Sequence, residues 1–307
     1  MKNIFLFLTF SFLLYGYDEI KIKSSTSCEA TLVAHDTGKD KAILFIHGYN
    51  DYFFHEHLAK RFIDEGFDFY ALDLHGYGRS IECEQNYNIY DISDYFTELE
   101  NSINTIRSRG VKDLTIVAHS QGGLMATMYA KEHNNFERLV LNAPFYEVYS
   151  NGFVVNVLKP FVGWIGGAFK DGRLPDIRGE SPYNKDLYKR WHFDKKLKKL
   201  KTDGLYLGYL NAINRAQREL KEGAKFAMPL LLLSSDKNGD VTNPEELVCS
   251  DTVISVQRVK ELSQEFEGDI TYIPIKDAQH DIYLSYNKPR NKAIDTTIEW
   301  IKSKLPQ

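Results

Sequence analysis

The sequence predicts an α/β protein built around a mostly parallel sheet. Six short runs, each apolar on both faces, alternate with segments of helical spacing from about residue 40 to the end of the chain. Strands of this kind that alternate with helices are typical of repeated βαβ units, in which helices cover both faces of the sheet. The content of 43% hydrophobic and 26% charged residues over 307 positions is ordinary for a protein with a full core.

The predicted elements follow one another in a regular order. Before residue 40, YDEIKIKS and EATLVAHDTG predict an N-terminal hairpin. The six strand candidates are KAILFIHG, FDFYALDLHG, LTIVAHS, RLVLNAP, PLLLLSS and ITYIPI. Helical spacing occurs in HEHLAKRFIDEG, ISDYFTELENSINTIRSRG and GGLMATMYAKEH between strands, and in AIDTTIEWIKSK at the end. Gly66 and Gly110 can end the first two of these helices.

This alternation breaks between about residues 146 and 225. The stretch has helical pieces but no strand of the earlier kind, and we interpret it as a cap inserted over the carboxyl edge of the sheet. Its basic run, DKKLKKLK, is more typical of a solvated helix face than of a lipid-binding site. Its aromatic side chains could line an apolar pocket or pack within the cap itself; they include Tyr146, Phe153, Trp164 and Phe169.

The first residues, MKNIFLFLTFSFLLYGYDEI, have the pattern of a secretory signal. Lys2 provides a positive start, and residues 4–15 are nearly all apolar but too few for a comfortable membrane span. We expect residues 1–17 to be a signal peptide, residues 18–307 to be the folded domain, and the protein to be periplasmic or secreted. An uncleaved N-terminal anchor is the alternative.

Net charge and cysteine spacing argue against nucleic-acid binding, CxxC redox chemistry and zinc-knuckle sites. The net charge of −4 gives no reason to expect a nucleic-acid partner. Cys28, Cys83 and Cys249 are odd in number, so at most one internal disulfide can form, and their spacing excludes CxxC redox chemistry and zinc knuckles. Export permits a disulfide but does not require one.

A serine stands between the third of the six strands and the helix that follows it. A strand, a sharp turn and a helix around a serine form a nucleophile elbow, usually Gly-x-Ser-x-Gly. Here Ala118 replaces the first glycine, Ser120 holds the central position, and Gly122 keeps the second glycine. The alternative is that Ser120 only caps the helix.

A nucleophilic serine needs a base and an acid, in the chain order Ser, Asp or Glu, His. Of the nine histidines, His280 lies in the loop after the last strand, from which a base can reach the carboxyl edge of the sheet. We interpret the other histidines near strand or helix ends as structural; they are His47, His55, His57, His75 and His119.

Two aspartates compete for the role of the acid. Asp236 follows the strand PLLLL directly, with Asp240 close behind, whereas Asp251 precedes the helix and strand that lead to His280. The segment DKNGDVTNPEEL contains Gly, Pro, Asn and Asp, which is typical of a loop that leaves the sheet after Asp236. We therefore prefer Asp251 and keep Asp236 as the alternative.

With these residues in place, the chain resembles the α/β-hydrolase superfamily. Within it, the resemblance is to the serine aminopeptidase S33 and monoacylglycerol lipase branch, often labelled lysophospholipase-like. It covers about residues 40–305 and rests on LFIHGYNDYFFHEHLA, FYALDLHGYGRS, VAHSQGGL, SDTVISV and QHDIYLS. It implies an α/β-hydrolase fold with a variable helical cap.

The resemblance also implies roles for single residues. Ser120 would be the nucleophile, His280 the base and Asp251 the acid, because DTVISV resembles the acid segment of the family. The oxyanion hole would use the backbone N–H groups of Tyr49 and Gln121.

The implied function is that of a serine hydrolase cleaving carboxylic esters, like a carboxylesterase, a monoacylglycerol lipase or a lysophospholipase, through an acyl-enzyme. Such chemistry requires no metal or organic cofactor. The expected partner is a small ester or lipid. If the substrate is a lipid, transient contact of the protein with a membrane surface is possible. The alternatives are a peptidase, which would need acids to hold a free amine, and a non-catalytic binding protein on the same fold. The motifs do not specify the natural substrate, the acyl length, the cysteine pairing or the oligomeric state.

Overall fold

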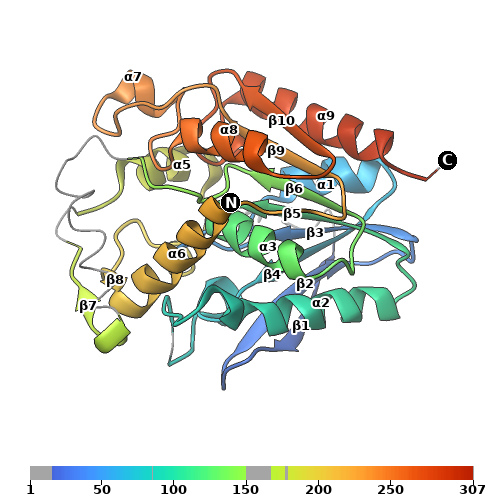
Figure 1. Cartoon of the computed structure of the whole chain (residues 1–307), viewed down its shortest axis with the longest axis horizontal. Coiled ribbons are helices and arrows are strands. Elements are labelled where there is room, and N and C mark those ends of the chain that lie inside the picture. The colour runs from blue at the N-terminus through green and yellow to red at the C-terminus, as the bar shows by residue number, and fades with distance from the viewer. Residues whose placement is uncertain (1–15, 85, 150–166, 177–178, 307) are drawn as a thin grey trace, which may run out of the picture.

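A computed structural model of the chain describes residues 16–84, 86–149, 167–176 and 179–306. Its central sheet contains β1 (Asp18–Lys23), β2 (Glu29–His35), β3 (Lys41–Ile46), β4 (Asp68–Asp73), β5 (Asp113–His119), β6 (Arg138–Asn142), β9 (Leu230–Ser235) and β10 (Ile270–Ile275). The eight strands lie in the order β1-β2-β4-β3-β5-β6-β9-β10 (Figure 1). Nearly all of the expected signal peptide, residues 1–17, falls outside the described residues.

The sheet is parallel except at one edge. From β4 through β3, β5, β6 and β9 to β10, every neighbouring pair is parallel, whereas the hairpin of β1 and β2 joins β4 in the antiparallel sense. Every residue of β5 and β9 is buried, because both faces of these strands are covered. The predicted α/β class, the mostly parallel sheet and the N-terminal hairpin are therefore confirmed.

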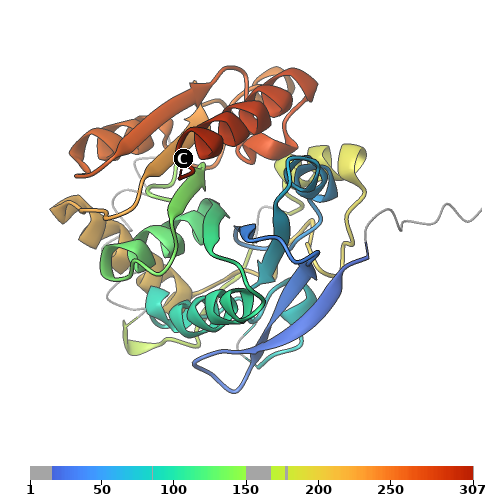
Figure 2. The same cartoon turned by 90° about the vertical axis from the view of Figure 1, so that its right-hand side faces the viewer.

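Helices form a layer on each face of the sheet (Figure 2). One layer contains α1 (Glu56–Asp64) and α9 (Asn287–Ser303), and the other contains α2 (Phe96–Ser108), α3 (Ser120–Glu132) and α8 (Val256–Glu265). Every residue of α3 from Ser120 to Ala130 is buried, so this helix belongs to the core. In the described parts of the chain, no helix combines the length and the apolar character that a membrane crossing needs.

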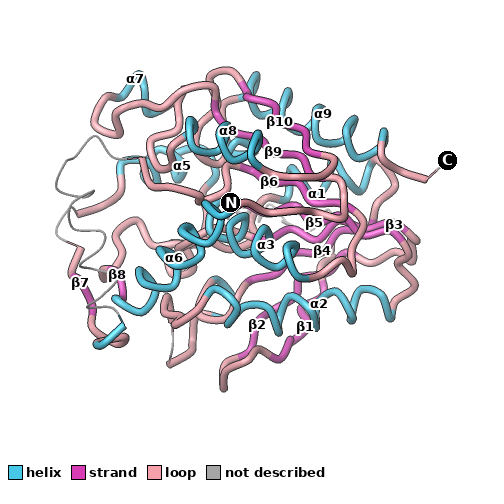
Figure 3. Tube along the Cα trace, viewed as in Figure 1, coloured by secondary structure: helices cyan, strands magenta, loops and turns pink. Residues whose placement is uncertain are grey.

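The described part of the expected cap, about residues 146–225, contains two full α-helices, two short strands and the short helix η3 (Leu220–Glu222). The α-helices and strands are β7 (Arg173–Leu174), α5 (Pro182–Trp191), β8 (Leu205–Tyr206) and α6 (Leu207–Glu219), and they lie beside one end of the sheet in a loop-rich region (Figures 1 and 3). The Ser181 side chain caps α5 by accepting from the backbone N–H of Asn184 at 3.2 Å. At the other end of α5, Arg190 and Trp191 both donate to the Leu284 carbonyl, at 2.6 and 3.0 Å. This helix is therefore anchored to the loop after β10.

One expectation about the cap is wrong. The basic run is not a solvated helix, because residues 195–200 form turns and bends and the Lys198 side chain is buried. The aromatic residues of the cap, for which the sequence allows pocket lining or packing within the cap, lie in different places. Tyr146 packs in the core, where its hydroxyl bonds to Thr127 at 2.8 Å, and Phe169 is 67% exposed. Phe153 and Trp164 lie outside the described residues.

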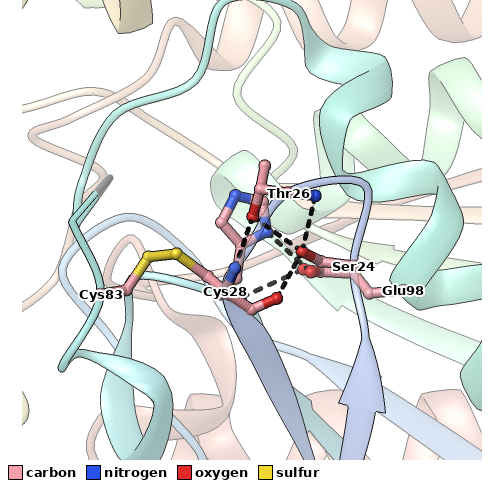
Figure 4. Close-up of a disulfide and its surroundings, with 6 residues drawn as sticks. Ser24, Thr26, Cys28, Cys83 and Glu98 are labelled. Atoms are coloured by element: carbon pink, nitrogen blue, oxygen red, sulfur yellow. Dashed lines mark hydrogen bonds and ion pairs between the residues drawn. A yellow bond between two sulfur atoms is a disulfide. The ribbon is translucent and has the colours of Figure 1, made fainter.

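A disulfide joins Cys28, between β1 and β2, to Cys83, in the loop after the short helix η1 (Gly78–Ser80) (Figure 4). Beside it, the Ser24 hydroxyl donates to the Cys28 carbonyl at 2.7 Å and hydrogen-bonds to the Thr26 hydroxyl at 2.9 Å. Cys249 is a free thiol. The bond therefore ties the edge hairpin to the loop that follows β4.

Replacing Cys28 and Cys83 with serine is expected to lower the free energy of unfolding by about 2–4 kcal/mol. The bond joins positions 55 residues apart, so its loss restores considerable chain entropy to the unfolded state. Urea unfolding of the parent and the double variant measures the change, with Cys249→Ser as the matched control. Equal midpoints for the parent and the double variant would contradict the prediction.

The buried pair of His75 and Glu98 should make stability depend on pH. His75 Nδ1 donates to Glu98 Oε2 at 2.7 Å, and both side chains are at most 1% exposed. Burial lowers the pKa of His75, but the adjacent Glu98 carboxylate outweighs burial and raises this pKa above its usual value. The stabilisation is then complete below the unfolded-state pKa of about 6.5 and disappears as pH rises through the raised value. As pH rises above about 6.5, the urea midpoint of the parent should therefore fall relative to that of Glu98→Gln. A constant difference between the two proteins would refute this.

Candidate active site

Ser120 lies in the tight turn between β5 and α3. Its backbone has φ of +51°, in the left-handed region that non-glycine residues seldom occupy. A Cβ on Gly122 would lie 2.3 Å from the His47 carbonyl oxygen, and a Cβ on Gly48 would lie 3.0 Å from the Ser120 Cβ. The loop after β3 therefore runs directly against the serine. Gly122 has no room for a side chain, and a Cβ at Gly48 would be in tight contact with Ser120.

The alanine at the first position of the elbow is accommodated within the sheet. Ala118 is completely buried in β5, level with Ile46 of β3 and Leu141 of β6. The departure from the usual glycine is therefore absorbed within the sheet.

Ser120, His280 and Asp251 are joined in one chain of hydrogen bonds. His280 Nε2 lies 2.9 Å from Ser120 Oγ, and His280 Nδ1 lies 2.9 Å from Asp251 Oδ2. The other carboxylate oxygen of Asp251 accepts from the backbone N–H groups of Val253 and Ile254, at 2.8 and 2.9 Å. Because the carboxylate can only accept, His280 Nδ1 carries the proton and Nε2 is left to accept from the serine hydroxyl.

Asp236, the alternative acid, makes no contact with His280 among the described residues. Asp236 is exposed, and its Oδ1 accepts from the backbone N–H of Asp277 at 2.9 Å. The segment after it makes an excursion that contains α7 (Pro244–Leu247) and returns to the site. Within this excursion, Asn238 donates to the carbonyl oxygens of Asp251 and Ile254 at 2.9 and 2.6 Å. The excursion thus holds the loop that presents Asp251.

The two expected oxyanion residues lie on segments that adjoin the serine. Gln121 follows Ser120 at the start of α3 and is buried, with its side-chain oxygen accepting from the Tyr77 hydroxyl at 3.3 Å. Tyr49 follows Gly48, whose carbonyl accepts from His47 Nδ1 at 2.7 Å. His47 Nε2 accepts from the backbone N–H of Leu74 at 3.0 Å, so this histidine fixes the backbone just before Tyr49.

A second buried polar network, which sequence reasoning missed, lies beside the first. The Asp281 carboxylate accepts from His55 Nε2 and from the Asn142 amide, each at 2.8 Å. His119 donates through Nδ1 to the Asn142 carbonyl at 3.0 Å, and its ring centre lies 4.8 Å from that of His280. In the sequence, Asp281 follows His280 and His119 precedes Ser120. This adjacency to the expected catalytic residues is the signal in the sequence that could have indicated Asp281 and His119.

The charges of this network follow from burial and contact. Burial lowers the pKa of His119 to about 4, so its imidazole is neutral at neutral pH. Burial alone would raise the pKa of Asp281, but the imidazoles of His119 and His55 and the hydrogen bonds it accepts hold that pKa well below the usual range. An ionised carboxylate therefore lies one residue beyond His280.

Three side chains in this region have the residue types of a metal site. Ligand atoms of Asp51, His119 and Asp281 all lie within 4.8 Å of one another. However, Asp51 Oδ1 lies 2.9 Å from Lys198 Nζ, and both oxygens of Asp281 already accept hydrogen bonds from side chains. Since the carboxylates have partners within the protein, we assign no cation to this cluster.

The chain is similar to one known protein family and to several proteins of known name or structure. A family model described as "Serine aminopeptidase, S33" matches residues 37–284. A protein from Arabidopsis thaliana, named probable lysophospholipase BODYGUARD 4, is 26% identical over 145 residues, which make up 46% of this chain and only 33% of that protein.

Two solved structures show the same fold at low identity. The monoacylglycerol lipase of Paleococcus ferrophilus has a TM-score of 0.68 and 18% identity, with 94% of this chain and 100% of that chain covered. A soluble variant of monoglyceride lipase from Saccharomyces cerevisiae, bound to a substrate analog, has a TM-score of 0.69 and 14% identity, with 96% and 98% covered.

Proposed function

Because the chain belongs to the serine aminopeptidase S33 family of α/β-hydrolases, we propose that it cleaves carboxylic esters, as a carboxylesterase or a lipase acting on monoacylglycerols or lysophospholipids. The observation that carries this proposal is the unbroken chain of hydrogen bonds from Asp251 through His280 to Ser120. The names of the similar proteins, a probable lysophospholipase and two monoacylglycerol lipases, support the ester class.

The reaction would proceed through an acyl-enzyme. Ser120 Oγ attacks the ester carbonyl carbon while His280 Nε2 takes the hydroxyl proton, and Asp251 stabilises the resulting imidazolium. The backbone N–H groups of Tyr49 and Gln121 would donate to the oxygen that becomes negative. When the tetrahedral intermediate collapses, the alcohol leaves with the proton from His280. A water molecule, deprotonated by His280, then attacks the acyl carbon, and the acid leaves as His280 returns the proton to Ser120 Oγ.

The carboxylates near the serine favour an ester over a peptide with a free amine. A site for a free amine needs an acid without a partner, whereas Asp51 is paired with Lys198 and Asp281 with His55. Both pairs are buried, so an incoming ammonium group would have to displace an existing partner.

We also propose that the protein is exported. The apolar pattern of residues 1–17 is the main support, and the disulfide between Cys28 and Cys83 adds to it, because such bonds persist in oxidising compartments. Fractionation of the producing cells would test this, since recovery of the protein with cytoplasmic markers would reject it.

Turnover of a graded set of substrates tests the proposed reaction. The purified chain would be assayed with p-nitrophenyl esters from acetate to palmitate, with monooleoylglycerol and lysophosphatidylcholine, and with alanine and proline p-nitroanilides. We expect ester turnover, with the best acyl length defining the substrate class. Cleavage of the anilides alone would identify a peptidase. A folded chain that cleaves none of these substrates and does not react with a fluorophosphonate would be a binding protein.

A further inference from the structure

The cap reaches the loop that carries Tyr49 through a buried ion pair. Asp51, two residues after Tyr49, lies with Oδ1 2.9 Å from Lys198 Nζ, and the two side chains are 3% and 5% exposed. The Lys198 ammonium also lies 5.7 Å from the ring centre of Phe54 and 5.6 Å from that of Phe193. The Lys198 ammonium is therefore held by the Asp51 carboxylate and two aromatic rings and is not free in solvent.

A second contact beside the first uses the backbone of the cap. The Asn50 amide donates to the Lys199 carbonyl at 2.8 Å, and the Lys199 backbone N–H donates to Asn50 Oδ1 at 2.9 Å. Asn50 thus binds the cap as a neighbouring strand would, through one donor and one acceptor. Next along the loop, the Tyr52 hydroxyl accepts from the backbone N–H of Asp194 at 2.9 Å.

Residues 50, 51 and 52 therefore all contact cap residues 194–199, immediately after the expected oxyanion donor. The loop also turns through the left-handed region at Asn50, where φ is +49°. Asparagine adopts this conformation more readily than most non-glycine residues, and here its two hydrogen bonds to Lys199 hold it in place.

We propose that Lys198 and Lys199 of the cap are positioning residues that aim the backbone N–H of Tyr49 at the oxyanion, an inference that rests on the proposed function. An oxyanion donor acts only when it is already placed where the charge develops. Docking of cap residues 194–199 would thus be coupled to catalysis at Ser120 and not merely to substrate enclosure.

Lys198→Met tests this coupling because it removes the ammonium and keeps an apolar side chain. Lys196→Met is the matched control, since Lys196 is an exposed lysine of the same basic run. We expect Lys198→Met to lower kcat by about 10- to 100-fold with little change in KM. A displaced N–H donor stabilises the oxyanion of the transition state less well, whereas binding of the uncharged substrate depends on it little. Affinity for a trifluoromethyl ketone, whose adduct oxygen occupies the oxyanion position, should fall by a similar factor. Lys198→Arg should recover most of both losses.

The variant leaves the Asp51 carboxylate buried and unpaired, so it could fold poorly. A double variant, Asp51→Asn with Lys198→Met, removes both charges and should show the same loss of kcat in a stably folded protein. Parental kcat in this double variant, or a loss confined to KM, would overturn the proposal.

Hydrogen–deuterium exchange separates this inference from the proposed function. We expect faster exchange of residues 48–52 in Lys198→Met than in the parent, and parental exchange in Lys196→Met. If the parent hydrolyses no ester but the exchange responds in this way, the coupling of cap and loop holds and the proposed reaction fails. An active parent with unchanged exchange in Lys198→Met would reject the coupling alone.

Discussion

A Ser120→Ala variant is expected to lose ester hydrolysis by about 10⁶-fold in kcat while it keeps its fold. The loss is large because the variant has no nucleophile on the elbow and His280 Nε2 has no proton to accept. The only described side-chain contact removed at Ser120 Oγ is the 2.9 Å hydrogen bond to His280. We therefore expect the free energy of unfolding to stay within about 1 kcal/mol of the parental value.

Three measurements on Ser120→Ala check this expectation together. Turnover of p-nitrophenyl butyrate gives the loss of activity, and urea unfolding gives the stability. Mass spectrometry after fluorophosphonate treatment should show a label on the peptide that spans position 120 in the parent and none on that peptide in the variant. Ser108→Ala is the control, because the Ser108 hydroxyl lies on the exposed end of α2. If a stably folded Ser120→Ala variant kept more than a hundredth of parental turnover, Ser120 would not be the nucleophile.

The fold class and the meeting of Ser120 with His280 could be predicted because they depend on local patterns. Apolar runs alternating with helical spacing specify a parallel sheet, and the carboxyl ends of parallel strands meet at one edge. A serine after β5 and a histidine after β10 must then approach that edge, however far apart they are in the chain. The position of Asp251 beside His280 needed the structure, because composition shows that residues 236–250 leave the sheet but not where they return.

The contacts of Lys198 and Asp281 could not be predicted, because no sequence pattern indicates that their segments and those of their partners come together. In sequence, Lys198 is one of several lysines in a basic run, and nothing nearby marks it as buried. Its partner Asp51 lies in the loop after β3, and the partner of Asp281, His55, is 226 residues away. Buried charge depends on such pairs, which form only after the cap and the sheet have packed.

An Asp251→Asn variant is expected to lower kcat by about 10⁴-fold, whereas Asp236→Asn should stay within about twofold of the parent. The amide oxygen of an asparagine at position 251 can still accept from the backbone N–H groups of Val253 and Ile254. Its NH₂ group would then face His280 Nδ1, which has to become an acceptor. The imidazole proton moves to Nε2, where it points at Ser120 Oγ and prevents the histidine from acting as a base.

Because this loss arises from the tautomer of His280 and not from a lost fold, the two variants should unfold at similar urea concentrations. The NH signals of His280 in proton NMR spectra should move from Nδ1 in the parent to Nε2 in Asp251→Asn. The exposed carboxylate of Asp236 contacts the backbone of Asp277 and makes no described contact with His280, so its replacement leaves the base unchanged. If instead Asp236→Asn abolished turnover and Asp251→Asn retained it, the acid would have been assigned to the wrong loop. The hydrogen bond from His280 to Asp251 would then serve only to hold the histidine loop in place.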